Sequence, residues 1–303
     1  MALLLAASPL WADARRRVPS FGIDVEVVSL SLAVSDPRGQ RVTDVSEQEV
    51  AVYEDGVPQQ ITVFARQRWP ITLAVLIDAS SSMQNKLPFA QAAALRLLRT
   101  LSPEDKALVA QFSQRLTVLQ DFTSDQAALA AAVGSIAVNG NTALHTALYV
   151  ALKELAAQKR DGELARQALV VLTDGEDTAS AVTEEQVLEL ARGAGVNVYA
   201  IGIRDAARSE TALAEQVPRY FMTALARETG GRALFPTALE ELESLYEGIA
   251  EELRTLYGVA YASTNSRRDG RFRQIVIRSL RPSLLLRHRK GYYAPRARLA
   301  QAE

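Results

Sequence analysis

The stretch "ITLAVLIDASSSM", Ile71 to Met83, decides the fold, because seven almost wholly apolar residues end abruptly in an aspartate and three serines. A continuous apolar run of this kind predicts a strand that is buried on both faces, as in a parallel sheet covered by helices. The loops after such strands lie in the crevice where open α/β sheets bind ligands. We therefore expect Asp78, Ser80 and Ser82 to direct their oxygens toward a common point.

The same pattern continues along the middle of the chain. Apolar strand-like runs alternate with amphipathic helical patterns, which predicts a doubly wound, mostly parallel α/β sheet of Rossmann-like type. Pro88 suits the first turn of one helix, while Leu144, Leu148 and Leu155 fall on one stripe of another. The expected strands are 71–77, 107–113, 168–173, 197–203 and 232–235, and further helices are expected at 184–193, 220–228 and 239–254.

Both flanking regions alternate polar and apolar residues with the period of a β-strand. The first contains the pair Asp55-Gly56, a strong hairpin signal, and strand patterns return after Leu256. Because neither flank has enough strands to bury its own apolar face, we predict that the two combine into one small all-β, sandwich-like domain that holds the α/β domain as an insertion. The expected divisions are a leader at 1–20, β regions at 21–69 and 256–295, the α/β domain at 70–255 and a tail at 296–303.

Composition excludes several classes of protein. The 303 residues are 48% hydrophobic and 23% charged, a globular composition, and the net charge of −1 gives no general reason to expect a nucleic-acid partner. There is no cysteine, which excludes disulfides, thiolate metal sites and cysteine nucleophiles. No segment reaches the ~18 to 20 uninterrupted apolar residues of a membrane helix, so we expect no membrane span in the mature chain.

The two ends of the chain have features of their own. The first residues, MALLLAASPLWADA, resemble a secretory leader with cleavage after Ala14, although the usual preceding basic residues are missing. We therefore expect a secreted, periplasmic or cell-envelope protein. Between residues 255 and 303, eleven Arg and Lys residues stand against two acids. We expect a solvated basic strand face there, including a solvated His288, with a patch that binds an anionic surface or nucleic acid as the alternative.

The oxygen donors after the apolar strand suit a metal ion. One carboxylate and two hydroxyls are hard donors, which favour Mg²⁺, Mn²⁺ or Ca²⁺ over Zn²⁺. Two later loops add Thr142, at the start of a helix, and Asp174, at the end of a buried strand. Loops at strand ends of one sheet meet at one edge, so we predict a five-residue ligand set. The structural alternatives are an acid-serine turn, a helix cap at Thr142 and a turn residue at Asp174.

In this order the five residues resemble the metal-ion-dependent adhesion site (MIDAS) of the von Willebrand factor type A (VWA) family, over about Ile71 to Arg254. The flanks "VSDPRGQRVTDVSEQEVAVYEDGVPQQITVF" and "GYYAP" resemble bacterial VWA-related proteins of acidobacterial type that are predicted to be exported.

The VWA resemblance implies that the serines and the threonine contact the cation directly and that an aspartate contacts it through water. An open coordination position would then accept an Asp or Glu carboxylate from a protein partner. It also implies conformational switching through the helix at 239–254. The predicted function is metal-dependent protein binding in adhesion or assembly, and the alternative is a metal that only stabilises the fold. The sequence specifies no oligomeric state.

Catalytic patterns are weak in this chain. A haloacid-dehalogenase-like phosphatase would need a second aspartate two residues after Asp78, where this chain has Ser80. Neither G-x-S-x-G nor a G-x-x-x-x-G-K-[ST] phosphate loop occurs, and there are two histidines in all. We therefore predict no enzyme, with a metal-dependent phosphatase-like hydrolase as the less favoured alternative. His145 is expected to be packed or partly exposed, and Asp177 to be exposed, with a supporting position beside the ligand set as its alternative.

Overall fold

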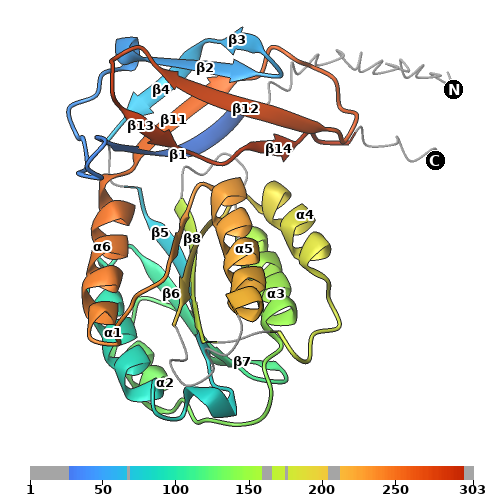
Figure 1. Ribbon diagram of the computed structural model, residues 1–303. Helices are drawn as coiled ribbons and strands as arrows, with labels where there is room; N and C mark the ends of the chain where they lie inside the picture. Colours follow the sequence, from blue (N-terminus) through green and yellow to red (C-terminus); the bar gives the residue numbers. More distant parts are fainter. Residues whose placement is uncertain (1–26, 67–68, 159–165, 175–176, 204–211, 297–303) are drawn as a thin grey trace, which may run out of the picture.

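Strand β5 (Ile71–Asp78) is central in a six-stranded sheet whose order is β10-β9-β8-β5-β6-β7. The computed structural model describes residues 27–66, 69–158, 166–174, 177–203 and 212–296 (Figure 1), so the predicted leader lies outside the described residues. Five strands run parallel and confirm the prediction: β5, β6 (Lys106–Phe112), β8 (Arg166–Thr173), β9 (Asn197–Gly202) and β10 (Arg232–Leu234). Every residue of β8 is buried, which explains its unbroken apolar pattern.

One strand of this sheet was not predicted. Strand β7 (Leu116–Thr123) runs antiparallel to β6 at the edge of the sheet. None of its side chains is fully buried, so its sequence lacks the apolar run that identifies the central strands.

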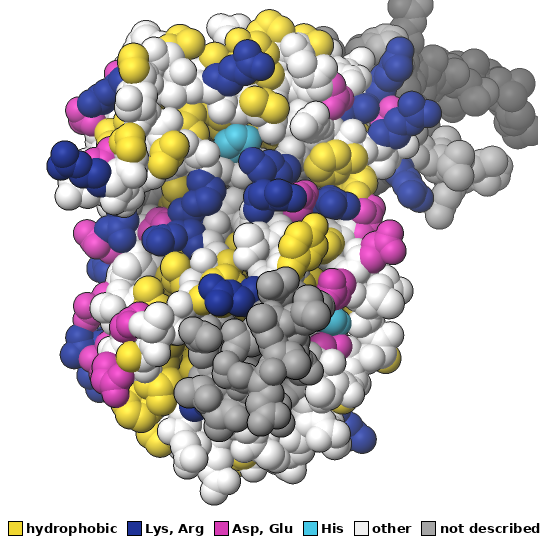
Figure 2. Space-filling model, in the orientation of Figure 1, with side chains coloured by type: hydrophobic (Ala, Val, Ile, Leu, Met, Phe, Trp, Pro, Cys, Tyr) yellow, Lys and Arg dark blue, Asp and Glu magenta, His cyan; other side chains and the backbone are white. Residues whose placement is uncertain are grey.

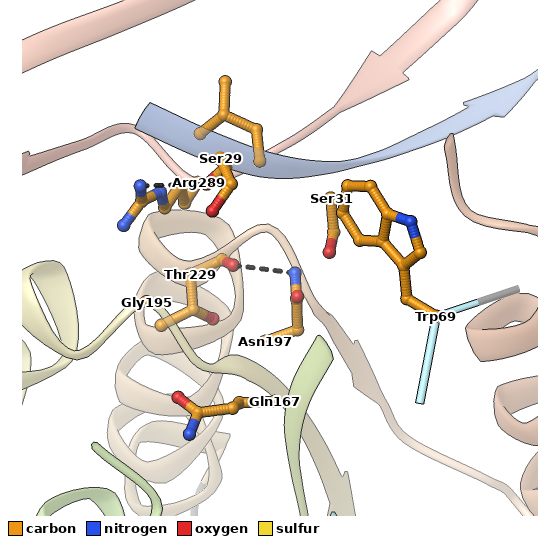
Figure 3. Close-up of a pocket in the computed structure, with 9 residues that line it drawn as sticks. Ser29, Ser31, Trp69, Gln167, Gly195, Asn197, Thr229 and Arg289 are labelled. Atoms are coloured by element: carbon orange, nitrogen blue, oxygen red, sulfur yellow. Dashed lines mark hydrogen bonds between the residues drawn. The ribbon is translucent and has the colours of Figure 1, made fainter. Parts of the chain in front are cut away.

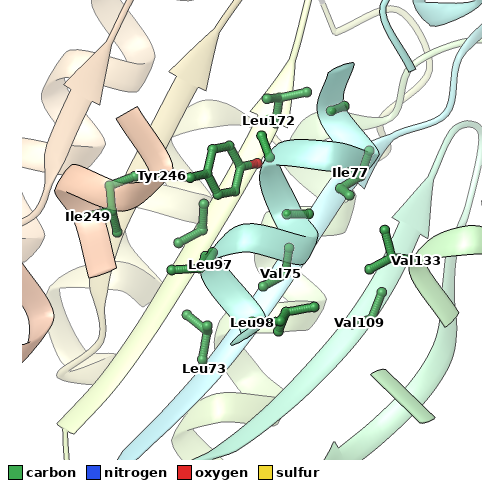
Figure 4. Close-up of a cluster of buried hydrophobic side chains, with 14 of the residues drawn as sticks. Leu73, Val75, Ile77, Leu97, Leu98, Val109, Val133, Leu172, Tyr246 and Ile249 are labelled. Atoms are coloured by element: carbon green, nitrogen blue, oxygen red, sulfur yellow. The ribbon is translucent and has the colours of Figure 1, made fainter. Parts of the chain in front are cut away.

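Helices cover both faces of the sheet (Figure 1). Helices α1 (Leu87–Arg99), α2 (Gln126–Gly134) and α6 (Glu241–Thr255) pack on the face that contains Leu73, Val75 and Ile77 (Figure 4). Helices α3 (Leu144–Ala157), α4 (Glu184–Ala194) and α5 (Ala212–Thr229) pack on the opposite face. Helix α2 was not predicted, because its alanine-rich sequence has no apolar stripe.

The two flanking regions form two antiparallel sheets, as predicted. One has the order β13-β1-β11-β4 and the other the order β14-β12-β2-β3. Strand β1 pairs with β11 and strand β2 pairs with β12, so each sheet joins the first flank to the last. The strand bounds are β1 (Val27–Ser35), β2 (Val50–Glu54), β3 (Val57–Gln59), β4 (Ile61–Ala65), β11 (Tyr257–Ala262), β12 (Phe272–Ser279), β13 (Leu285–Arg287) and β14 (Gly291–Tyr293).

A shared core holds these two sheets together as a β-sandwich. Leu30, Leu32, Val52, Tyr261 and Ile277 are buried in it. The hairpin predicted between β2 and β3 is present. Its two turn residues have φ of 48° and 81°, the left-handed conformation that a two-residue hairpin of type I′ requires.

The β-sandwich lies against the amino ends of the parallel strands. Helix α6 leads directly into β11, and Arg166 at the start of β8 donates to the carbonyl of Leu253 at 2.9 Å and to that of Leu256. A polar cavity of ≈ 30 Å³, enough for about one water, lies at this boundary (Figure 3). Beside it the Asn197 side chain donates to the carbonyl of Thr229 at 3.0 Å. Within the described ranges, no helix is both long and apolar enough to cross a bilayer.

The prediction that the basic C-terminal strands present a solvated face is wrong for several residues. His288 is 4% exposed, and its Nε2 accepts the backbone N–H of Ile277 at 3.1 Å. Burial lowers the pKa of His288 to about 4. Arg287 pairs with Glu252 at 2.7 Å and Arg273 with Asp269 at 2.9 Å. Figure 2 shows Lys and Arg side chains gathered where the β-sandwich meets the α/β domain, so part of the basic region serves this boundary.

Candidate metal centre

The carboxyl ends of β5 and β8 lie side by side, because Ile77 is in register with Leu172. This register places Asp78 next to Thr173, whose hydroxyl donates to Asp78 Oδ2 at 2.6 Å. The other carboxylate oxygen, Oδ1, accepts the backbone N–H of Ser80 at 2.8 Å. Asp78 is 0% exposed, so its carboxylate is held in one orientation from both sides.

The electrostatic environment of Asp78 is a balance of opposing effects. Burial raises the pKa of Asp78, hydrogen bonds from Thr173 and Ser80 oppose that rise, and the nearby charge of Asp174 adds to it. A cation placed here would stabilise the charged carboxylate that burial disfavours.

The serine loop turns sharply after Asp78. Residues Ser81–Met83 form a single 3-10 turn, and the fully buried Met83 anchors it in the core. The hydroxyls of Ser80 and Ser82 lie 3.1 Å apart, and Ser82 Oγ donates to Asp174 Oδ1 at 2.8 Å. A continuous series of side-chain oxygens therefore links two loops of the sheet.

The second oxygen of Asp174 is also engaged. Its Oδ2 forms an ion pair with the Nζ of Lys86, and the two side chains are 1% and 12% exposed, respectively. Sequence reasoning did not identify Lys86 or Thr173. The only sequence indications were a cation four residues after Ser82 and a hydroxyl at the end of an apolar strand.

The third loop is joined to the serine loop through its backbone. Ser81 donates its N–H to the carbonyl of Gly140 at 3.0 Å, and the N–H of Asn139 donates to the carbonyl of Ala79 at 2.6 Å. These bonds fix Asn139 and Gly140 against the serine loop. Thr142 follows two residues later, is 5% exposed, and its carbonyl accepts the N–H of Thr178 at 2.8 Å. Thr142 does not cap α3, since the N-cap residue is Ala143 and has no side-chain capping bond.

Asp177 supports the start of α3 in place of Thr142. Its Oδ1 accepts the N–H of Leu144 at 2.9 Å, and its Oδ2 lies 2.8 Å from Nδ1 of His145. The side chain of Asp177 is 13% exposed, so the expectation of an exposed residue was wrong. His145 packs edge-on against Phe221, with ring centroids 4.7 Å apart, which confirms a packed or partly exposed histidine.

The structure thus joins Asp78, Ser80, Ser82 and Asp174 by direct hydrogen bonds and adds Thr142 through its loop. In the part of the chain that the structure describes, no three His, Asp or Glu side chains gather in a metal-binding arrangement. Any cation at this edge must therefore rely on hydroxyl oxygens as well as carboxylates, and such hard donors fit Mg²⁺, Mn²⁺ or Ca²⁺.

Residues 72–247, more than half of the chain, match the family model of the von Willebrand factor type A domain. This chain belongs to the von Willebrand factor type A domain family. No protein of curated function matches the sequence.

Several solved structures share the VWA fold at low sequence identity. A von Willebrand factor type A protein from Catenulispora acidiphila is 14% identical with a TM-score of 0.51, over 92% of this chain and 76% of that chain. The proximal thread matrix protein 1 of the mussel byssus, with a zinc-occupied MIDAS motif, is 18% identical with a TM-score of 0.52, over 67% of this chain and 50% of that chain. The PilB minor pilin of Streptococcus sanguinis is 14% identical with a TM-score of 0.50, over 63% of each chain.

These similarities establish the fold alone. The VWA chain described here spans about half the length of the byssus protein and less than two thirds of the pilin.

Proposed function

We propose that this VWA chain is a divalent-metal-dependent protein-binding module. Its MIDAS ligands would be Asp78, Ser80, Ser82, Thr142 and Asp174. The observation that supports this most directly is the hydrogen-bonded series from Ser80 through Ser82 to Asp174, at the edge of the sheet beside the buried Asp78. Two loops far apart in sequence bring side-chain oxygens together here, and backbone bonds join the loop of Thr142 to the serine loop, which supports a ligand set over a single local turn.

The chain's own residues fix the orientation of these ligands. Thr173 and the backbone of Ser80 hold Asp78, while Ser82 holds one oxygen of Asp174. Such outer contacts set the direction of a ligand's lone pairs and commonly change metal affinity by 10- to 100-fold. We propose Mg²⁺ as the resident ion, with Mn²⁺ or Ca²⁺ as possible substitutes. When bound, the cation would supply an electrophilic position for one further oxygen ligand.

The proposed partner is a protein that offers an Asp or Glu carboxylate. The described part of the site offers a cation two carboxylates, Asp78 and Asp174, and a hard cation so placed retains charge that favours an additional anionic oxygen. The similarity to a minor pilin and to a thread matrix protein is in keeping with a role in adhesion or assembly, not in catalysis. We propose an exported or envelope location and no nucleic-acid partner.

Affinity capture tests this function. Immobilised wild-type protein is exposed to extract from the native cell envelope in Mg²⁺ and, in parallel, in EDTA. We expect partners that are retained in Mg²⁺ and released by EDTA, and no retention by Asp174→Ala. Asp121→Ala, which removes an exposed carboxylate from β7, is the matched control and should behave as wild type. Equal capture in Mg²⁺ and EDTA would contradict the proposal.

A metal that only stabilises the fold is the second candidate. The burial of the two carboxylates favours this structural role, because Asp78 is 0% exposed and the side chain of Asp174 is 1% exposed. Metal binding to the native state alone raises the melting temperature in either case. The two functions separate when acidic peptides or partner proteins are added to the Mg²⁺-saturated protein. A further rise in melting temperature supports partner binding, and no rise supports an internal metal.

A metal-dependent phosphatase-like hydrolase is the least favoured alternative. His145 follows Thr142 by three residues, but both of its ring nitrogens lie near carboxylates outside the proposed ligand set. Its Nδ1 is 2.8 Å from Asp177 and its Nε2 is 3.9 Å from Glu184. Turnover of a generic phosphate ester that disappears in Asp78→Ala would support this alternative.

Switching through α6 remains a hypothesis in this chain. The carboxyl end of α6 is held by Arg166, and the carbonyl of Gly248 accepts from Arg41 at 2.9 Å. A displacement of α6 along its axis would have to break these bonds. Structures with and without Mg²⁺ test the hypothesis, and an unmoved helix in both would contradict it.

A further inference from the structure

Lys86 occupies a position that its own helix does not favour. It is the residue immediately before α1, the N-cap position, where Ser, Thr, Asp and Asn are preferred because their side chains accept backbone N–H groups. Lys86 makes no such capping bond. A cation is also disfavoured there, since the helix macrodipole is positive at its N-terminus. Helix capping therefore does not explain a lysine at this position.

The contact with Asp174 does explain it. The Lys86 ammonium meets Oδ2 of Asp174, while Oδ1 accepts from Ser82. Both oxygens of this carboxylate are thus engaged by one short loop. The loop is rigid, because Met83 is fully buried and the N–H of Lys86 donates to the carbonyl of Met83 at 2.9 Å. With the Asp174 side chain 1% exposed, little water screens the pair.

The charge at this edge of the sheet depends on that contact. Asp78 receives hydrogen bonds from neutral groups, which leave its negative charge in place. Lys86 adds a full positive charge at contact distance from the second carboxylate. A divalent ion that approaches Asp174 therefore meets a carboxylate whose charge is already neutralised.

We infer that Lys86 is a resident counter-cation that competes with the divalent ion for Asp174 and thereby weakens metal affinity. This inference rests on the proposed metal function. Without metal, Lys86 keeps the buried Asp174 neutralised and the three loops assembled. A bound cation would compete with the Lys86 ammonium for the negative charge of Asp174. The site then fills only at higher metal concentrations than the five ligands alone would require.

Metal titration of lysine variants tests this inference. Mg²⁺ is titrated by isothermal calorimetry into metal-free wild type, Lys86→Met, Lys86→Arg and Lys106→Met. We expect Lys86→Met to bind Mg²⁺ on the order of 10-fold more tightly than wild type, because it retains the aliphatic stem and loses the competing charge. Lys86→Arg should bind no more tightly than wild type. Lys106→Met removes an exposed charge from the opposite end of the sheet and should match wild type.

Thermal stability gives a second readout. In EDTA, Lys86→Met should melt below wild type, because Asp174 becomes a buried and unneutralised charge. Saturating Mg²⁺ should close this gap. If wild type binds Mg²⁺ and Lys86→Met binds it equally or more weakly, the inference is overturned while the metal function stands. If neither binds Mg²⁺, Mn²⁺ or Ca²⁺, both fall.

Discussion

The six-stranded sheet buries charged groups at both of its ends. One end faces the β-sandwich (the sandwich end), and the candidate ligands lie at the other (the ligand end). At the sandwich end, the buried side chains of Arg166 and Glu252 are both held by hydrogen bonds or ion pairs. Arg166, 2% exposed, donates to the terminal carbonyls of α6, where the helix dipole favours a cation. Glu252, 5% exposed, accepts from Tyr199 at 2.7 Å and pairs with Arg287 at 2.7 Å.

At the ligand end the charges do not balance. Among the described residues that form the hydrogen-bonded site, Asp78 and Asp174 supply two negative charges and Lys86 supplies one positive charge. The two ends share the same strands and the same apolar core. The difference is one of charge, since the described residues at the ligand end carry one more negative than positive charge, as the proposed cation site requires.

The largest expected effect lies at the sandwich end. Arg166→Met would leave buried carbonyls at the end of α6 without donors, so we expect the free energy of unfolding to fall by about 4 kcal/mol. The affinity of the folded protein for Mg²⁺ should not change. Urea denaturation and calorimetric titration measure the two quantities. Arg227→Met, whose parent side chain is 68% exposed, is the control. A loss of Mg²⁺ affinity in Arg166→Met would break the distinction between the two ends.

Acid should weaken the β-sandwich through His288. Burial lowers the pKa of His288 from 6.5 to about 4, so the unfolded chain takes up a proton at a higher pH than the folded one. The free energy of unfolding that neutral His288 permits is fully present above pH 6.5. Roughly 3 kcal/mol of it is lost as the pH falls toward 4. Urea denaturation across this range measures the slope. His288→Gln should flatten it relative to wild type, and identical slopes would show that His288 does not titrate as described.

At the ligand end, Thr173→Val tests the orientation of Asp78. The substitution keeps the shape of the side chain and removes the hydroxyl that donates to Asp78 Oδ2. We expect Mg²⁺ affinity to fall on the order of 10-fold. Thr117→Val, at an exposed position on β7, should leave affinity unchanged. Unaltered Mg²⁺ binding in Thr173→Val would mean that Asp78 needs no such support.

The smallest effect concerns the core between the two ends. Tyr246 extends from α6 into the cluster shown in Figure 4, and its fully buried hydroxyl has no hydrogen-bond partner among the described residues. Tyr246→Phe should therefore raise the free energy of unfolding by about 1 kcal/mol, since it removes a buried polar group that is unsatisfied. Urea denaturation measures the change. A decrease would indicate a partner for this hydroxyl, such as a bound water.

The central strands could be predicted because burial on both faces leaves an unbroken apolar run, as in β5 and β8. The hairpin at Asp55-Gly56 was equally clear, because few residue pairs tolerate its backbone conformation. Strand β7 and helix α2 were missed because both lack a periodic apolar pattern. For His288, strand-like alternation does not distinguish a side chain that faces water from one that faces a neighbouring sheet.

The candidate site also contains contacts that the sequence could predict and contacts that it could not. Asp78, Ser80 and Ser82 stand together in the sequence, so their proximity follows from a single turn. The contact of Thr173 with Asp78 depends on the register between two strands that are far apart in the sequence. The contact of Lys86 with Asp174 depends on how two loops pack, which no local pattern encodes.

Anomalous diffraction from crystals grown with Mn²⁺ tests the central claim most directly, since it locates the ion independently of any binding assay. The account predicts one strong peak in contact with the Ser80 and Ser82 hydroxyls, between Asp78 and Asp174 and beside Thr142, and no such peak in Asp174→Ala crystals. Crystals of the folded wild type with saturating Mn²⁺ and no peak at this edge of the sheet would contradict it.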